Sequence, residues 1–438
     1  MSQTLMAPRP APPLDRMLLD ARARTLALAS DLDGSQLLGP RLSIVNPPLW
    51  ELGHLAWFQE RWCLRQIEGT LALLPSVLTG ADQLYDSAAV AHSTRWDLPL
   101  PTLGATLDYL AQVLARVLAR LDSGRTDALH YFAQLAALHE EMHCEAFTYT
   151  RQTLGYAAPR IEQSRVQQGQ SAAARAGPLG DTDIAGGAFM LGAAADSSFV
   201  LDNEKWAHAV HVAPFRMARA CVSNGEFRAF VEDRGYACGA WWTAESWRWR
   251  ESADASHPIY WRREAGAWQV RWFDTWQPLD DAAAVVHVNW HEASAYCRWA
   301  GRRLPTEAEW EFAAATGREE GAAKRRYPWG DAAPQVPQAN LYGGCGRVLD
   351  VAALPEGDSA WGCRQMIGNV WEWTADAFGP YAGFVADPYK EYSQPWFGDH
   401  KVLRGGCFAT RPVLIRATWR NFYTPERRDV FAGFRTCA

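Results

Sequence analysis

The sequence predicts a multidomain protein of mixed class, an all-α N-terminal domain followed by an α+β domain. The chain has 438 residues, and one hydrophobic core seldom extends beyond about 250–300 residues. Apolar residues recur at helical spacing from residue 14 to about residue 155. After residue 181 the apolar runs are short, and Gly, Pro, Asn and Asp interrupt them. This change of pattern indicates two domains.

Four amphipathic helices are expected in the first domain. The clearest apolar stripe consists of Leu107, Leu110, Leu114, Val117 and Leu121, with one apolar side chain every three or four residues. Helices of this length typically pack as an antiparallel four-helix bundle whose interior is lined by side chains. The predicted helices span residues 15–32, 48–68, 103–122 and 126–154.

The boundary between the domains is expected where the apolar period is lost. Residues 164–181, SRVQQGQSAAARAGPLGD, are rich in Gly, Gln and Ala, which is typical of a linker. We therefore assign residues 14–163 to the helical bundle, 164–181 to the linker and 182–438 to the α+β domain. Within the α+β domain, helical periodicity is clear only at residues 223–234 and at 291–299 with its continuation 306–315.

Composition excludes several classes of function. Hydrophobic residues make up 48% of the chain and charged residues 21%, which is globular composition. The formal net charge of −6 argues against nucleic acid or an anionic membrane as the principal partner. No apolar run approaches the ~20 residues of a membrane span. The nine cysteines never form a CxxC pair, so we expect a soluble cytoplasmic protein with reduced thiols.

The strongest chemical signal is a histidine pair in the fourth predicted helix, within LHEEMHCE. At about 100° per residue, His139 and His143 lie on one face and can reach one metal ion, whereas Glu145 points elsewhere. A third ligand must come from another helix. His54 is the best candidate because it lies among bulky apolar residues of the second helix, and bundles build metal sites from facing helices.

Three imidazoles without a carboxylate suit either catalytic zinc or non-haem iron, and ligand type alone leaves both open. Facial iron sites usually include a carboxylate. A thiolate or selenolate from a substrate would supply the missing negative charge.

Six short motifs follow one another in the second domain: GAFMLG at 187–192, GRRLPTEAEWE at 301–311, YPWG at 327–330, GNVWEW at 368–373, LRGG at 403–406 and GFR at 433–435. In this order they resemble the formylglycine-generating-enzyme-type domains, which implies a C-type-lectin-like α+β fold. The formylglycine-forming oxidases use a pair of cysteines near the Arg-Gly-Gly segment to bind copper. Here Cys407 lacks a second cysteine nearby, which disfavours that activity.

A three-histidine bundle before such a domain resembles the ergothioneine-type sulfoxide synthases, non-haem iron enzymes with a DinB-like first domain. The resemblance implies Fe(II) bound by His54, His139 and His143, with O2 as co-substrate. It implies hercynine, the trimethylated betaine of histidine, as a substrate. Glu145 matches the acid of the family's HxxxHxE motif, and we interpret it as a structural residue or as one that supports a ligand.

The resemblance also implies the residues that act on substrate. The family's catalytic tyrosine lies in a loop before the Arg-Gly-Gly segment, where this chain has Tyr389 and Tyr392. We interpret Tyr389 as the proton donor and Tyr392 as a substrate contact. Asn421 and Phe422 stand where the family binds the betaine, and the ring of Phe422 can attract a quaternary ammonium.

Three departures from the family pattern concern the chalcogen donor. Tyr423 stands where γ-glutamylcysteine-using members have an aspartate, Arg95 is the only arginine left in a normally arginine-rich loop, and Met142 replaces a glutamine. All three weaken recognition of a zwitterionic peptide. They favour the selenoneine-synthase branch, which this chain resembles and which joins hercynine to a selenosugar, 1-seleno-β-D-glucose.

Other hypotheses remain open. An ergothioneine synthase would use γ-glutamylcysteine or cysteine instead of the selenosugar. DinB-like bundles with three histidines also activate thiols on zinc, so a zinc-dependent thiol transferase is a further alternative. A non-catalytic ligand-binding module with a structural metal is the fourth. Relatives of the second fold suggest a structural calcium ion near Asn369 and Glu372.

Overall fold

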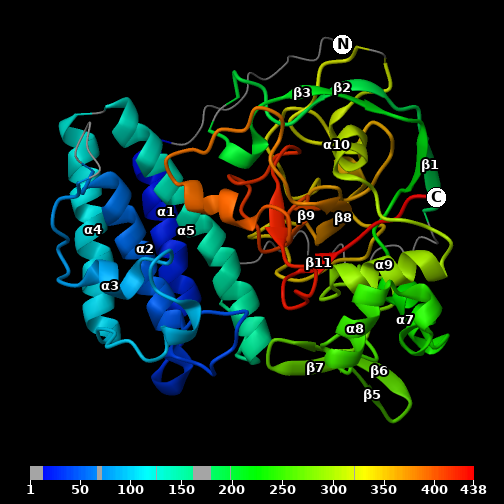
Figure 1. Cartoon of the computed structure of the whole chain (residues 1–438), viewed down its shortest axis with the longest axis horizontal. Helices are drawn as coiled ribbons and strands as arrows, with labels where there is room; N and C mark the ends of the chain where they lie inside the picture. The colour runs from blue at the N-terminus through cyan, green and yellow to red at the C-terminus, as the bar shows by residue number, and fades with distance from the viewer. Residues whose placement is uncertain (1–12, 67–71, 125, 161–178, 198, 320) are drawn as a thin grey trace. The chain divides into compact units, whose positions relative to one another are not determined.

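The computed structural model describes residues 13–66, 72–124, 126–160, 179–197, 199–319 and 321–438. The described residues form two compact units, one from residue 13 to 160 and the other from residue 179 to 438 (Figure 1). Among the described residues, none of the helices combines the length and the apolar character needed to cross a membrane.

The first unit is a helical bundle. Helix α5 packs against α1 and α2, and α2 packs against α4 (Figure 1). The side chains of Thr102 and Thr126 cap the N-termini of α4 and α5, and Gly155 ends α5 in the left-handed conformation. The four long helices are α1 (Leu14–Ala29), α2 (Pro48–Cys63), α4 (Leu103–Ser123) and α5 (Asp127–Leu154), with the short α3 (Ala81–Tyr85) between α2 and α4.

Buried ion pairs join α1 to α5. Arg22 Nε lies 2.8 Å from Glu140 Oε1, and Arg24 donates to the carboxylate of Glu141. All four side chains are buried. Because breaking one partner would leave a buried charge unpaired, at a cost of about 3–5 kcal/mol, these pairs hold α5 in one rotation about its axis.

The described strands of the second unit form four sheets. The largest has the order β10-β9-β8-β11, with β11 parallel to β8 and the other neighbours antiparallel. Its strands are β8 (Trp371–Ala377), β9 (Lys401–Arg404), β10 (Asn421–Tyr423) and β11 (Ala432–Gly433). Three smaller sheets pair β1 (Asp181–Ile184) with β4 (Phe215–Ala218), β2 (Gly187–Leu191) with β3 (His208–Val212), and β6 (Ala267–Trp272) with both β5 (Trp261–Glu264) and β7 (Thr275–Pro278).

Helices of the second unit are short and strongly capped. Capping boxes begin α7 at Ser223, α9 at Asn289 and α10 at Thr306. Among the residues that the structure describes, its α-helices are α7 (Asn224–Glu232), α8 (Ala244–Ser252), α9 (Trp290–Trp299) and α10 (Glu307–Ala315).

Buried arginine–carboxylate contacts connect the sequence motifs of the second unit. Arg404 of LRGG donates to Glu307 and Glu311 of GRRLPTEAEWE. Arg435 of GFR donates through two nitrogens to Glu372 of GNVWEW, at 2.5 and 2.7 Å. Motifs far apart in sequence are therefore parts of one charged core, in which each guanidinium needs its carboxylate.

Two predictions of secondary structure are wrong. Helix α2 ends at Cys63 rather than near residue 68. Helix α8 was missed because only Ser246 of its nine residues is buried, so it has no apolar stripe. The predicted linker, 164–181, lies mostly outside the described residues, and its last residue, Asp181, already begins β1.

The side-chain oxygens of Asn369 and Glu372, near which a calcium ion was expected, take part in hydrogen bonds. Glu372 accepts from Arg435 and from the Trp310 indole. Asn369 Oδ1 accepts from the backbone of Leu349 and from the Asn340 amide. These oxygens are thus used in the protein's own hydrogen bonds, and a calcium ion near them stays a prediction.

We predict that His287 makes the second unit less stable in acid. Its ring is buried against Tyr260 and Phe431, at centroid distances of 4.7 and 5.1 Å. Burial, with the nearby charge of Arg271, lowers its pKa from 6.5 to about 3. Below pH 6.5 the unfolded chain binds a proton that the folded chain does not, so stability is lost as pH falls toward 3, by about 1.4 kcal/mol per pH unit.

Urea unfolding of wild type and His287→Phe between pH 7 and 5 measures this effect. The wild type is expected to lose about 2 kcal/mol more than the variant over this range. His257→Phe replaces a partly exposed ring of the same unit and is the control. Parallel pH profiles for wild type and His287→Phe would show that His287 is not responsible.

Candidate metal centre

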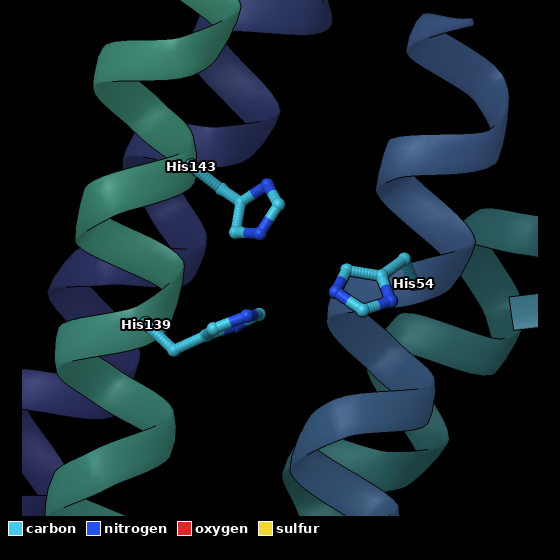
Figure 2. Close-up of side chains that lie close together, drawn as sticks. All are labelled: His54, His139 and His143. Carbon is cyan, nitrogen blue, oxygen red and sulfur yellow. The ribbon is translucent and has the colours of Figure 1, made fainter. Parts of the chain in front are cut away.

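Three histidines come together inside the bundle. His54 on α2 points toward His139 and His143 on α5 (Figure 2). One ligand nitrogen from each lies within 4.8 Å of the others. In the part of the chain that the structure describes, no other group of three His, Cys, Asp or Glu side chains meets this criterion. The structure therefore brings the three predicted histidines together, two of them at i, i+4 spacing on α5 and the third on α2.

A backbone carbonyl determines the tautomer of His54. Its Nδ1 lies 2.8 Å from the carbonyl oxygen of Tyr85, and because a carbonyl only accepts, Nδ1 carries the proton and Nε2 presents a lone pair. Gly53 makes this contact possible: a Cβ there would lie 2.2 Å from ring atoms of Tyr85. The small residue beside the ligand lets Tyr85 approach α2.

A carboxylate orients His143 in the same way. Its Nδ1 donates to Glu51 Oε1 at 2.7 Å, and the Glu51 side chain is 1% exposed. Glu51 precedes His54 by three residues on α2, so the two side chains lie on the same face of that helix. A carboxylate behind a ligating imidazole fixes the ring and raises its basicity, an arrangement common in metal sites.

The electrostatics of the triad favour neutral imidazoles. Burial, followed by the nearby charge of His143, lowers the pKa of His54 to about 3 and holds that of His139 well below its usual value. Metal ions bind the neutral ring. Imidazole nitrogens fit a transition metal such as iron or zinc, and His54 and His143, whose Nδ1 atoms contact the Tyr85 carbonyl and Glu51, have Nε2 available as the ligand atom.

Aromatic rings surround the ligands. His54 stacks between Trp50 and Trp57 at centroid distances of 5.0 and 5.7 Å, and His139 stacks on Phe58 at 3.6 Å. These rings hold the imidazoles in single orientations and limit the access of water to the triad.

Arg95, a predicted substrate residue, lies close to the triad. Its guanidinium lies 3.9 Å from the centroid of Trp50, on which it stacks. The other buried arginines of the bundle, Arg22, Arg24, Arg65 and Arg151, each pair with a carboxylate. Arg95 instead donates to the Asn46 side chain and to backbone carbonyls. Burial lowers its pKa to about 10, against the opposing attraction of Glu51.

Two other predicted residues lie on α5. Met142 is half-buried directly before His143, and Glu145 is buried two residues after it. Glu51, which the sequence analysis did not single out, contacts the predicted ligand His143. An acid three residues before a histidine in an otherwise apolar helix was the signal that would have identified it.

In the second unit, the structure brings Tyr389, Tyr392 and Phe422 together. Tyr389 precedes the short 3-10 helix η7 (Lys390–Tyr392) and lies 6.2 Å from Tyr392 between ring centroids. Tyr392 meets Phe422 edge-on at 5.8 Å. One face of Phe422 is covered by Phe378, stacked at 4.0 Å. Sequence reasoning missed Phe378.

Asn421 and Tyr423 flank Phe422 on β10. Asn421 Oδ1 accepts from the backbone of Phe422 at 2.8 Å. Tyr423 lies under the guanidinium of Arg427, which is 4.9 Å from its ring centroid and pairs with Asp429. Because side chains alternate along a strand, Asn421 and Tyr423 share one face and Phe422 the other.

We predict that Glu51→Gln weakens metal binding by about 10- to 100-fold, because a neutral amide orients His143 but no longer raises its basicity. Dissociation constants of Fe(II) and Zn²⁺ measured by competition with a chelator test this. Glu60→Gln, on the same helix, is the control, since Glu60 accepts from Tyr109 and Ser76. Equal weakening in both variants would indicate general damage to α2 rather than a role for Glu51.

Comparisons with known proteins agree with this organisation. A family model described as DinB superfamily matches residues 17–146, and one described as Sulfatase-modifying factor enzyme 1-like domain matches residues 171–438. The predicted fold class, a DinB-like bundle followed by a formylglycine-generating-enzyme-like domain, is confirmed. The formylglycine-generating enzyme of Streptomyces coelicolor is 32% identical over 312 residues, covering 61% of this chain and 94% of that protein.

Two relatives match nearly the whole chain. The hercynine oxygenase of Mycolicibacterium thermoresistibile is 38% identical over 436 residues, covering 96% of this chain and 94% of the relative. The hercynine oxygenase of Mycobacterium tuberculosis is 38% identical over 421 residues, covering 95% of this chain and 96% of the relative. With both domains in order and three histidine nitrogens within reach of one ion, the chain belongs to the hercynine oxygenase family and is an iron-dependent oxidoreductase.

Proposed function

We propose that this enzyme couples hercynine to a thiol in an oxygen-dependent reaction, forming a carbon–sulfur bond at C2 of the imidazole. The observation that carries the proposal is the triad of His54, His139 and His143, oriented by Tyr85 and Glu51, in a chain similar over its length to hercynine oxygenases. In this reaction the imidazole C–H and the thiol S–H are lost. One oxygen atom of O2 ends in the sulfoxide and the other in water.

Fe(II) held by the three histidines would supply the oxygen activation. The surrounding residues contribute orientation and the exclusion of water. Trp50, Trp57 and Phe58 cover the imidazoles. With only neutral protein ligands, the site favours binding of an anion such as a thiolate or selenolate.

Tyr389 is proposed as the proton donor, with Tyr392, Asn421 and Phe422 as substrate contacts. Burial raises the pKa of Tyr392 well above its ordinary value, so this phenol stays protonated. The half-buried ring of Phe422 offers an apolar surface to the trimethylammonium of hercynine. The Asn421 amide nitrogen remains a potential hydrogen-bond donor, since its oxygen accepts from the backbone.

The tyrosine loop is anchored at both ends. Lys205 Nζ lies 2.7 Å from each oxygen of Asp387, two residues before Tyr389. Ser393 donates to Asp202, directly after Tyr392. Asp202 lies in the short 3-10 helix η3 (Asp202–Glu204). Such anchoring supports a catalytic role because it limits the positions that the two phenols can take.

A selenosugar donor is the second candidate, in a selenoneine synthase reaction. Tyr423 has no negative charge with which to bind a peptide ammonium, and Met142 has no polar group for a peptide donor. Arg95 supplies only one guanidinium, whereas several arginines in this loop would be expected to bind the carboxylates of γ-glutamylcysteine. Losing the charge partner of a desolvated ammonium costs about 2–5 kcal/mol. These features favour a donor that is uncharged apart from its chalcogen.

Oxygen uptake by the iron-reconstituted protein tests the function. Hercynine is combined with γ-glutamylcysteine, cysteine or 1-seleno-β-D-glucose, and the products are identified by mass. Hercynine-dependent uptake and a C–S product are expected with a thiol donor. A C–Se product formed faster than either C–S product would favour the selenosugar. Zinc-dependent thiol transfer without oxygen uptake would contradict both assignments.

We predict that Tyr389→Phe lowers kcat for the coupled product by about 100-fold, the usual contribution of a positioned proton donor. Rapid-quench measurement of product checks this. Tyr392→Phe, assigned to substrate contact, is expected to change KM more than kcat. If Tyr389→Phe retained the wild-type kcat, the proton would have to come from another group.

A further inference from the structure

Lys401, the first residue of β9, has an unusual environment. Its side chain is half-buried, and its ammonium lies 4.2 Å from the ring centroid of Trp290. Among the described residues, this ammonium forms no hydrogen bond or ion pair, although it has three protons to donate. A partly buried cation is normally paired, because unmet hydrogen bonds of a charged group are costly.

The residue directly opposite Lys401 is Tyr423. In the antiparallel pair of β9 and β10, Tyr423 is in register with Lys401, and Phe422 with Val402. Directly opposed residues project from the same face of a sheet. Lys401, Tyr423 and Asn421 therefore share one face, while Phe422 projects to the other.

Charged groups of both signs surround Lys401 and Tyr423. Arg427 lies over Tyr423 but pairs with Asp429, whereas Lys401 has its cation–π contact instead of a carboxylate. Burial lowers the pKa of Lys401, and the attraction of Asp376 and Glu245 opposes this. Asp376 accepts a hydrogen bond from the backbone of Glu307, and Glu245 is exposed. The three proton donors of the Lys401 ammonium are therefore not used by any described residue.

We propose that Lys401 is a specificity residue for the chalcogen donor. Its ammonium binds hydroxyl or carboxylate oxygens of the donor and repels a donor that carries an ammonium at this point. The inference rests on the proposed function, in which Tyr423 lines the donor site. It identifies the donor class as oxygen-rich on this side, a description that fits a sugar and also the carboxylate of a peptide thiol.

Small thiols of opposite charge test the sign of the site. The probes are 1-thio-β-D-glucose with hydroxyls, 3-mercaptopropionate with a carboxylate, and cysteamine with an ammonium. Dissociation constants are measured by calorimetry with the metal-free full-length protein, and KM in hercynine-dependent oxygen uptake with the iron-loaded protein. Lys401→Met keeps the apolar stem on Trp290, and Lys401→Glu reverses the charge. Arg263→Met, which removes an exposed cation from the face of Trp268, is the matched control.

Lys401→Met is expected to weaken binding of thioglucose or mercaptopropionate by about 10-fold, the effect of losing one hydrogen bond to a charged group. Lys401→Glu is expected to strengthen cysteamine binding by about 5-fold. If Lys401→Met weakens the binding of thioglucose, Lys401 binds hydroxyls. If it weakens the binding of mercaptopropionate, Lys401 binds a carboxylate. Unchanged ratios between the three probes, equal effects of Arg263→Met, or no measurable binding to the wild type would overturn the proposal.

The two proposals fail in different measurements. If the wild type consumes no oxygen with hercynine and any donor, the proposed function is wrong, and Lys401 is then judged by the calorimetric constants alone. If uptake is normal and the variants show wild-type constants and KM values, the function stands and the role of Lys401 is rejected.

Discussion

The metal centre depends on the rotational setting of helix α5. Two of its consecutive acids, Glu140 and Glu141, are bound by Arg22 and Arg24 of α1, which directs the neighbouring His139 and His143 toward α2. A small rotation of α5 would break buried ion pairs on one side and separate the imidazoles from His54 on the other. The sequence HEEMH thus combines ligands and the charges that orient them in five residues.

Helix α2 supplies the residues that face His139 and His143. It supplies His54 as a ligand and Glu51 as the carboxylate behind His143, while Gly53 leaves room for the Tyr85 backbone to bind His54. The four residues from Glu51 to His54 thus contain the ligand, the carboxylate that orients His143, and the glycine that lets Tyr85 lie close to α2. The two helices therefore orient each other's ligands, and neither forms the centre alone.

The second unit has short helices and strands, and buried ion pairs join them. Buried guanidinium groups of Arg404 and Arg435 hold α10 and β8 to the Arg-Gly-Gly and Gly-Phe-Arg segments. Glu372 belongs to β8 and Arg404 to β9, and β9 pairs with the edge strand β10, which carries Asn421, Phe422 and Tyr423. The ladder presents two chemically different faces, one with Phe422 beside Tyr392 and one with Tyr423 opposite Lys401.

The sequence by itself determined the class of both domains, the four long helices and the three histidines, because helical periodicity is local and the i, i+4 spacing places His139 and His143 together on any regular helix. It also identified the family through ordered motifs. Only the tertiary structure decided that Glu51 and the Tyr85 carbonyl orient the ligands, that Phe378 covers Phe422, and that Lys401 lies opposite Tyr423. These contacts join residues distant along the chain, and their register depends on packing and strand pairing, which local periodicity does not encode.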